Sequence, residues 1–318
     1  MKFFQKLALT AALMTLSINP SFAATFSVTS TADSGAGSLR QAIIDANTAE
    51  GDDIIDFLLG SEPQTINLSS GLGIFSNLSI LSSNLLSVSG NDTFDIFQIG
   101  GGATVDISGL TITNGRNGIS NSGRVTLTNT TITSNTNNGI VTQPGAIVTL
   151  TNSTVSGNGS RGILNFGSTL NIGNSIIAQN PTDIIFIFTG QGAINDQGYN
   201  LIGNGDGTPF VNGVNGNIVG TGANPVDPLL EPLTDNNGII QTLALLPGSP
   251  AIDAANPNSF PATDQRGVTR PQGARADIGA FELAQTPSQP VPEPGTVLGL
   301  AGLGLFGLLR KKARFNHQ

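Results

Sequence analysis

Four copies of one pattern in the middle of the chain decide the fold: VDISGLTIT at 105–113, VTLTNTTIT at 125–133, VTLTNSTVS at 148–156 and LNIGNSIIA at 170–178. The copies start 20, 23 and 22 residues apart, and apolar residues stand at the first, third and eighth positions of each. Alternation with a period of two, broken by Gly and Asn at this spacing, is typical of a chain that climbs as a coil of short parallel strands.

The sequence therefore predicts an all-β fold, a right-handed parallel β-helix. One coil buries too few apolar side chains to offset the entropy lost in ordering about 22 residues, so the coils must stack on each other. Apolar segments with looser spacing extend the pattern upstream, at 65–68, 78–81, 85–88 and 94–99. Between residues 54 and 220 we expect seven or eight coils.

Two columns of asparagines recur with the repeat. The first column contains Asn129, Asn152 and Asn174, and the second contains Asn135, Asn158 and Asn180. Stacked side-chain amides can hydrogen-bond along the axis, as they do in cross-β ladders. We predict an asparagine ladder in the first column, while the second is either a second ladder or a set of exposed turn residues.

The open ends of a solenoid expose unpaired backbone groups, so we expect capping elements to cover them. Ser38 and Gln41 have the spacing of a capping box, in which each side chain bonds the other residue's backbone N–H. A helix starting there places Leu39, Ala42, Ile43 and Ala46 on one apolar face. We expect a short N-terminal capping helix within 24–60, coils over 61–221 and an irregular C-terminal cap over 222–284.

Residues 31–47 contain GSLRQAI, which resembles the CSLREAI motif that opens many bacterial surface β-helix proteins, related in style to polymorphic outer-membrane proteins. Five of seven motif positions match, with Gly37 in place of Cys and Gln41 in place of Glu. Residues 245–254, 264–271 and 277–282 are similar to the closing region of the same proteins, including those called choice-of-anchor. The resemblance implies a β-helix whose two ends are closed by these two regions. A covalent tie between the ends is absent, because Ala276 also stands where relatives often carry Cys.

The N-terminus has the features of a secretory signal. Lys2 and Lys6 precede an apolar run at 7–18, and small residues occupy the −3 and −1 positions before a cut after Ala23. The alternative, a permanent membrane anchor, is disfavoured because the run is shorter than the roughly 20 residues of a spanning helix. We predict that residues 1–23 are removed outside the cytoplasm.

After a linker at 285–291, the C-terminus contains three motifs in a fixed order along the sequence. They are Pro292, Glu293 and Pro294, an apolar segment at 296–309, and a basic tail with Arg310, Lys311 and Lys312. Basic residues after an apolar segment stay on the cytoplasmic side. The combination, spanning 292–318, resembles the PEP-CTERM sorting signal, which implies a transient inner-membrane anchor, an exosortase-type membrane protease as partner, and delivery to the cell surface or beyond.

Charge excludes several classes of function. All four Lys and the single His lie in the two terminal segments, leaving seven Arg against twenty Asp and Glu in residues 24–291. Nucleic acid is therefore a poor partner, and such a surface repels acidic polysaccharides. The chain has no Cys for disulfides or thiolate sites and no Trp for sugar-binding platforms.

Three groups of acidic residues are candidate sites. Asp92, Asp95 and Asp106 could meet on adjacent coils as a glycosidase requires, although surface solvation explains them better. Asp52, Asp53 and Asp56, and the loop at 204–208 around Asp206, are oxygen-rich but lack known Ca²⁺-binding spacing, so turn and corner roles are preferred over metal. A last cluster is expected to form ion pairs that fix the C-terminal cap, in preference to a binding site: Asp253, Asp264, Arg266, Arg270, Arg275, Asp277 and Glu282.

The sequence thus predicts an exported, non-catalytic β-helix protein with a structural or adhesive role at the bacterial surface or in the extracellular matrix. It predicts no catalytic residues and no cofactor, with exopolysaccharide as the expected partner. Two alternatives stay open at this point. One is a carbohydrate-active enzyme, either a polysaccharide lyase or a glycoside hydrolase, and the other is an adhesin stabilised by Ca²⁺.

Overall fold

The structure is a computed structural model, and it describes residues 22–187, 192–235 and 241–284. All described strands belong to one compact unit, Met1–Leu283. The predicted signal segment up to residue 21, the linker at 285–291 and the sorting segment at 292–318 lie outside the described residues. Within the described part, no helix combines the length and apolar character needed to cross a membrane.

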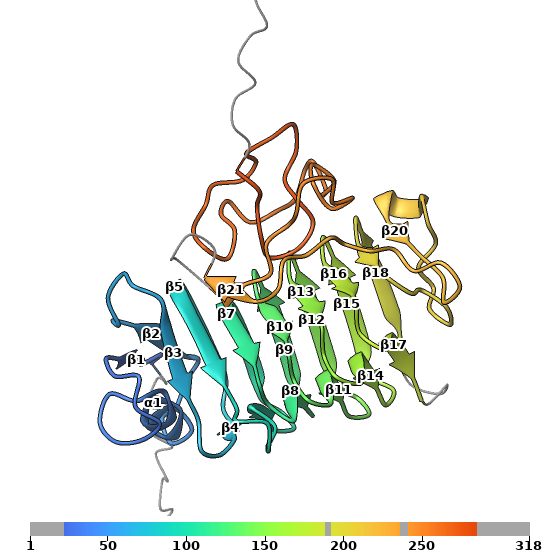
Figure 1. The fold of residues 1–318 in the computed structure, drawn as a ribbon. Coiled ribbons are helices and arrows are strands. Elements are labelled where there is room, and N and C mark those ends of the chain that lie inside the picture. Colours follow the sequence, from blue (N-terminus) through green and yellow to red (C-terminus); the bar gives the residue numbers. More distant parts are fainter. Residues whose placement is uncertain (1–21, 188–191, 236–240, 285–318) are drawn as a thin grey trace, which may run out of the picture. The chain divides into compact units, whose positions relative to one another are not determined.

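Parallel strands form a solenoid with three faces (Figure 1). Face A begins with β1 (Thr25–Val28) and continues through β2 (Asp53–Phe57), the first parts of β5 (Leu78–Ser89) and β7 (Thr104–Thr113), β9 (Arg124–Thr128), β12 (Ile147–Thr151), β15 (Thr169–Gly173) and β18 (Ile194–Gly198). Face B contains β3 (Gln64–Asn67), the second parts of β5 and β7, β10 (Thr131–Thr133), β13 (Thr154–Ser156), β16 (Ile176–Ala178), β19 (Leu201–Ile202) and β20 (Ile218–Val219).

Face C is a separate sheet of β4 (Leu72–Ile74), β6 (Phe97–Ile99), β8 (Asn117–Asn121), β11 (Asn138–Thr142), β14 (Arg161–Asn165) and β17 (Thr182–Phe186). Its six strands define six complete coils, fewer than the seven or eight predicted. The difference arises at the ends. Strands β2, β5 and β7 start 25 and 26 residues apart, a longer interval than in the central repeat, and β1 and β18 begin partial coils with no face C strand among the described residues.

The repeat places its apolar positions in register inside the coils. The first positions pair as Val105, Val125, Val148 and Leu170 in successive strands. The third and eighth positions pair in the same way, and all of these side chains are at most 1% exposed. The central core is therefore a stack of aliphatic columns, as the period of the sequence predicted.

The predicted helix is present as α1 (Leu39–Ala46), with its apolar face of Leu39, Ala42, Ile43 and Ala46 buried. The Ser38 hydroxyl accepts a hydrogen bond from the Gln41 N–H at 3.1 Å. The Gln41 side chain, however, donates to Asp45 Oδ1 at 2.8 Å instead of reaching back, because the Ser38 N–H already donates to the Gly35 carbonyl. Half of the capping box is thus confirmed.

Residues 222–284 run along face B (Figure 1, orange). The sequence had instead predicted that they would cover the C-terminal end of the coils. They include β21 (Thr234–Asp235) and β22 (Gln241–Thr242), an antiparallel pair, and follow the 3₁₀ turn η1 (Val214–Gly216). The Gln265 side chain accepts from Thr131 Oγ1 at 2.5 Å and donates to Thr111 Oγ1 at 2.8 Å. We call residues 222–284 the flank segment. Its position corrects the expectation of an end cap.

A second, smaller core forms under the flank segment. Ile176 and Leu201 of face B pack with apolar residues of the segment, including Leu245, Ile278 and Phe281. The segment can approach closely because residue 279 is glycine with φ +98°, where a Cβ atom would lie 2.7 Å from Ile176 Cδ1. Burial of these side chains, together with hydrogen bonds to the outward threonines of face B, attaches the segment to the coils.

Candidate functional site

The second asparagine column forms a buried ladder. Asn135 Nδ2 donates to Asn158 Oδ1 at 2.9 Å, and Asn158 Nδ2 donates to Asn180 Oδ1 at 3.1 Å. The ladder starts at the Gly115 N–H, which donates to Asn135 Oδ1, and ends where Asn180 Nδ2 donates to Asp183 Oδ1 at 2.9 Å. Asn135 and Asn158 are buried and Asn180 is half-buried, so the alternative of exposed turn residues for this column is wrong.

The first asparagine column is not a ladder, although it stacks as predicted. Asn129, Asn152 and Asn174 all adopt left-handed backbone conformations, with φ of 49°, 46° and 50°. This turn directs their amides away from the coil, where the Nδ2 atoms donate to backbone carbonyls of the flank segment, those of Thr263 (2.8 Å), Asp277 (3.5 Å) and Ser259 (2.7 Å). The column therefore attaches the flank segment to the coils.

A third polar column was missed by sequence reasoning. It lies directly after the first and comprises Thr130, Ser153, Ser175, Asn200 and Asn217, all at most 2% exposed. In this column the backbone N–H of each residue donates to the side-chain oxygen of the next, over 2.9–3.3 Å. The sequence contains a signal for three members, because Thr130, Ser153 and Ser175 each directly follow an asparagine of the first column.

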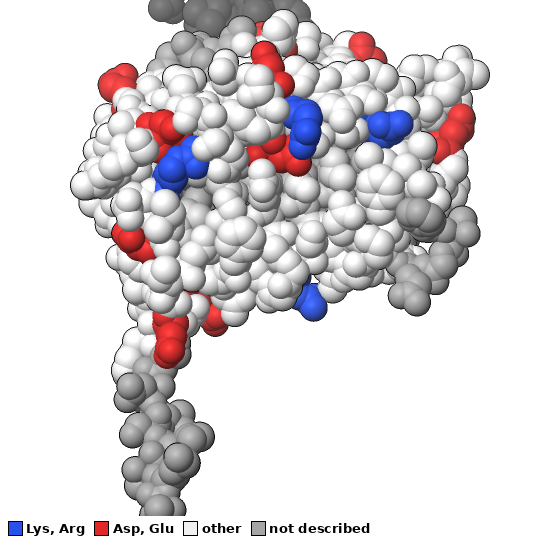
Figure 2. Space-filling model, turned by 90° about the horizontal axis from the view of Figure 1, so that it is seen from below, with Lys and Arg blue, Asp and Glu red and all other residues white. Residues whose placement is uncertain are grey.

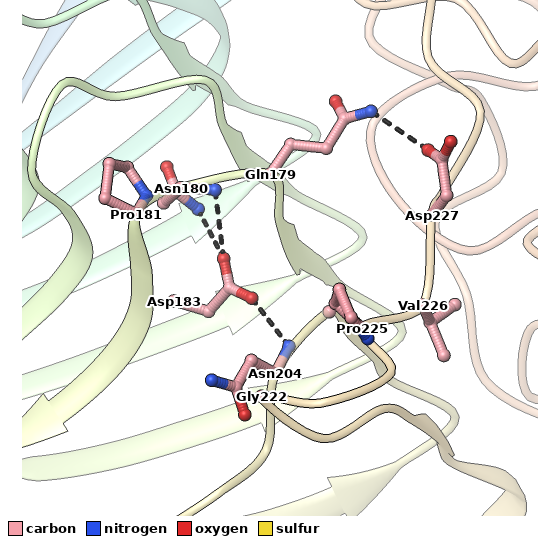
Figure 3. Close-up of a pocket in the computed structure, with 10 residues that line it drawn as sticks. Gln179, Asn180, Pro181, Asp183, Asn204, Gly222, Pro225, Val226 and Asp227 are labelled. Atoms are coloured by element: carbon pink, nitrogen blue, oxygen red, sulfur yellow. Dashed lines mark hydrogen bonds between the residues drawn. The ribbon is translucent and has the colours of Figure 1, made fainter.

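A groove of about 420 Å³ lies beside the end of the asparagine ladder (Figure 3). One wall is the corner between β16 and β17, with Gln179, Asn180 and Pro181, and Asp183 follows on β17. The other wall comes from the loop after β19 and from residues 222–227 of the flank segment. Gln179 Nε2 donates to Asp227 Oδ1 at 3.0 Å and joins the two walls.

Asp183 is the acid of this groove with the most perturbed environment. Burial raises the pKa of its carboxyl, and hydrogen bonds from Asn180 and Asn204 lower it by less. Oδ1 accepts from the backbone and side chain of Asn180, and Oδ2 accepts from the Asn204 N–H at 2.7 Å. A Cβ atom on residue 203 would lie 2.6 Å from Oδ2, so glycine is required there.

The groove offers little for acid–base chemistry. Both Asp183 oxygens accept hydrogen bonds from the protein, and Asp227 accepts from Gln179 and from the Leu229 N–H. A glycosidase needs one carboxyl free to donate a proton and another facing the sugar. Asp183 instead acts as the terminal acceptor of the asparagine ladder, a structural role.

The three acids considered as a glycosidase site, for which the sequence analysis preferred surface solvation, lie in different environments. Asp95 forms an ion pair with Arg116 at 2.9 Å and accepts from Asn117 Nδ2 at 2.7 Å, next to face C. Asp106 is exposed on face A, and Asp92 is exposed at the corner between faces B and C. Figure 2 shows one side of the molecule, where charged side chains stand as small separate groups on a mostly uncharged surface.

The oxygen-rich loops use their acids in turns and corners. Asn204 Oδ1 accepts from the Asp206 N–H, and Asp206 Oδ2 accepts from the Gly222 N–H at 2.8 Å. Asp52 Oδ1 accepts from Asn77 Nδ2 at 2.8 Å. Among the described residues, no group of three or more His, Asp or Glu is placed to hold a metal ion.

The charged cluster of the flank segment contains the predicted ion pairs. Arg266 pairs with Asp264 at 2.7 Å, and Arg270 pairs with Glu282 at 3.0 Å, the latter with both side chains fully buried. Arg270 also donates to the carbonyls of Asp277 and Gly279. Arg275 behaves differently, since it donates to the Ala255 carbonyl and lies 5.2 Å from the centre of the Tyr199 ring.

Asp277 gives this cluster a pH dependence. Burial raises the pKa of its carboxyl to about 6, despite hydrogen bonds from the Leu283 and Asp253 N–H groups at 2.7 Å. A carboxyl with a raised folded-state pKa favours folding when protonated, and this contribution is lost as pH rises from about 4 through about 6. We expect the free energy of unfolding to increase by about 1 kcal/mol between pH 7 and pH 5.

Thermal unfolding followed by circular dichroism across this range measures the effect. Asp277→Asn is expected to remove most of the increase, since the remaining contribution comes from Asp183, whose pKa is raised in the same direction. The control Asp106→Asn replaces an exposed carboxylate and should leave the increase intact. A flat profile in the unmodified protein would contradict the assignment of Asp277.

Comparison with known proteins places one segment. Residues 290–314 match the model of the PEP-CTERM protein-sorting motif, a range that contains Pro292, Glu293, Pro294, Arg310, Lys311 and Lys312. No curated protein matches the chain. The crystal structure of the pectate lyase Pel9A is similar with a TM-score of 0.33 and 14% identity, over 81% of this chain and 96% of that chain, a likeness that carries no weight for activity.

The match concerns the sorting segment alone. The resemblance of 31–47 to the CSLREAI motif and of the flank segment to choice-of-anchor proteins stays a prediction, as does the signal cut after Ala23. Ala23 itself is described and exposed.

Proposed function

We propose that this chain is a non-catalytic structural or adhesive protein, exported and delivered by an exosortase-type protease to the cell surface or the extracellular matrix. The observation that carries the proposal is a PEP-CTERM motif at 290–314 that follows, in the sequence, a parallel β-solenoid. The motif implies passage through the inner membrane and a temporary hold there. A stacked solenoid is an architecture that presents long, regular surfaces.

The side-chain inventory supports a role without catalysis. Residues 24–291 contain no Lys and no His, so a lyase would have to rely on one of seven Arg as its base. Two of these, Arg266 and Arg270, are held in ion pairs with buried carboxylates. Asp183, the acid with the raised pKa beside the groove, accepts three hydrogen bonds from N–H donors, at least one on each oxygen.

Face A supplies a surface suited to neutral polysaccharide. Thr126, Thr149, Asn171 and Asn195 stand opposite each other in successive strands and are at least partly exposed. We call these four residues the face A strip. Asn195 Nδ2 donates to Asn171 Oδ1, and Asn171 Nδ2 donates to Thr149 Oγ1. The strip offers uncharged hydroxyls and amides about 4.8 Å apart, which can bond sugar hydroxyls without charge repulsion.

A polysaccharide panel tests the proposal. The purified protein is incubated with neutral and acidic exopolysaccharides, and both binding and the release of new reducing or unsaturated ends are measured. We expect binding to neutral polymers with no release. The double variant Thr126→Glu/Thr149→Glu should weaken binding about tenfold or more, whereas Ser120→Glu on face C should bind normally.

Reproducible cleavage that is lost in Asp183→Asn or Asp106→Ala would contradict the proposal and favour the carbohydrate-active enzyme. A melting temperature that falls by several degrees on chelation would favour the Ca²⁺-stabilised adhesin. We expect neither result.

A further inference from the structure

The first strand starts at a buried carboxylate. Strand β1 pairs in parallel with β2, with Thr25 opposite Ile54, and the Ile54 N–H donates to the Ala24 carbonyl at 2.8 Å. On the other side of the same residue, the Ala24 backbone nitrogen donates to Asp53 Oδ1 at 2.8 Å. Residue 24 is thus held by both its backbone groups.

Asp53 has no counter-charge among the described residues. Asp53 is 0% exposed, and its second carboxylate oxygen, Oδ2, accepts no hydrogen bond. None of the four ion pairs between described residues involves it. A buried carboxylate with one neutral amide donor is poorly compensated, because burial removes the water that would otherwise solvate the charge.

The two described residues before Ala24 are exposed to solvent. Phe22 is 77% exposed, and Ala23 is also exposed, so the peptide bond between Ala23 and Ala24 follows exposed chain and lies directly before strand β1. The same bond has small residues at its −3 and −1 positions, Ser21 and Ala23, which is the pattern cut by signal peptidases.

We propose that Ala24 is the mature N-terminus and that its α-ammonium group forms an ion pair with Asp53. In the leader-removing step, water hydrolyses the Ala23–Ala24 peptide bond: its oxygen joins the Ala23 carbonyl carbon, and the Ala24 nitrogen leaves as an amine that takes up a proton. The new group carries a positive charge and three N–H donors where the precursor has one neutral amide. It therefore supplies Asp53 with a counter-charge and Oδ2 with a donor.

Removal of the leader thereby locks β1 onto β2 and completes the N-terminal end of face A. The inference rests on export as proposed above, because export brings the chain to the leader-removing protease. The ion pair itself is tested without export, so the two ideas fail separately.

The test compares two purified proteins, residues 24–318 with a free Ala24 and the same chain with Gly-Ser added before Ala24. The first is released from a fusion tag by a protease that leaves no extra residue. We expect the extended chain to melt about 5 °C lower at pH 7, since breaking a partly buried ion pair destabilises a chain of this size by that order. A free α-ammonium loses its proton near pH 8, or higher when paired, so the difference should disappear by about pH 10.

A cycle with Asp53→Asn identifies the partner. In that background the Gly-Ser extension should change the melting temperature by less than about 1 °C, whereas in the exposed control Asp52→Asn the full difference should persist. Equal effects of the extension in all three backgrounds, or no effect in the unmodified chain, would overturn the ion pair. If Asp53→Asn does not fold, the pH dependence of the unmodified pair of proteins decides alone.

The mass of the exported protein tests the cleavage site. A mature N-terminus at Ala24 is expected, and any other start would overturn the inference while leaving the proposed surface role intact. Retention of the whole leader would contradict the export on which both rest.

Discussion

Arg270→Ala is expected to lower the free energy of unfolding by about 3–5 kcal/mol, since it leaves Glu282 as an uncompensated charge in a fully buried site. The Glu282 carboxylate also accepts hydrogen bonds from the Gln272 and Asp277 N–H groups. By neutralising Glu282, Arg270 therefore stabilises a carboxylate that connects the backbone at these two positions. The flank segment should loosen before the coils, because the affected contacts lie within it.

Urea unfolding followed by circular dichroism measures the loss, and amide hydrogen exchange locates it. The control is Arg124→Ala, which removes an exposed arginine from face A and should change stability by less than about 0.5 kcal/mol. The double variant Arg270→Met/Glu282→Leu should be more stable than Arg270→Ala, because no lone charge remains. A cost for Arg270→Ala no larger than for Arg124→Ala would contradict the role of the pair.

Asn158→Ala is expected to cost about 2–4 kcal/mol by interrupting the asparagine ladder at its middle. Asn158 Oδ1 accepts from the side chain of Asn135, and Nδ2 donates to Asn180 and to the Ile132 carbonyl. Truncation leaves buried donors and acceptors on both neighbouring coils without partners, and each one costs part of its desolvation energy.

The same denaturation assay tests this loss, with Asn137→Ala as the matched control, since Asn137 is exposed at the equivalent corner of the preceding coil. Asn135→Ala combined with Asn158→Ala should cost less than the sum of the two single variants, because the residues share one network. Strict additivity would show that the two amides act independently and would contradict the ladder.

The repeated segments allowed the sequence to predict the coils. Val125, Leu127 and Ile132 recur with the same chemistry in each copy, and side-chain alternation forces those positions inward in every coil. The N-cap at Ser38 was equally readable, because its geometry depends on residues within one helical turn.

The partners of the asparagines were not predictable from the sequence. Asn129 and Asn135 have different partners because the backbone of Asn129 is left-handed and directs its side chain toward the flank segment. Its partner there, the Thr263 carbonyl, is 134 residues away in the sequence. Thr111 and Thr131 flank inward-facing apolar residues in their strands, and only the docked Gln265 shows that their hydroxyls are buried contacts. Long-range docking of an irregular segment leaves no periodic signal in the chain.

The central claim is that the folded unit is a scaffold sorted through its PEP-CTERM tail. The most direct measurement is the intact mass of this protein recovered from cells with and without the exosortase, fractionated into membrane, surface and medium. We predict a form shortened near residue 292 at the surface or in the medium of cells with the enzyme, and an untrimmed form in the inner membrane of cells without it. A full-length tail with the same distribution in both strains would contradict the account.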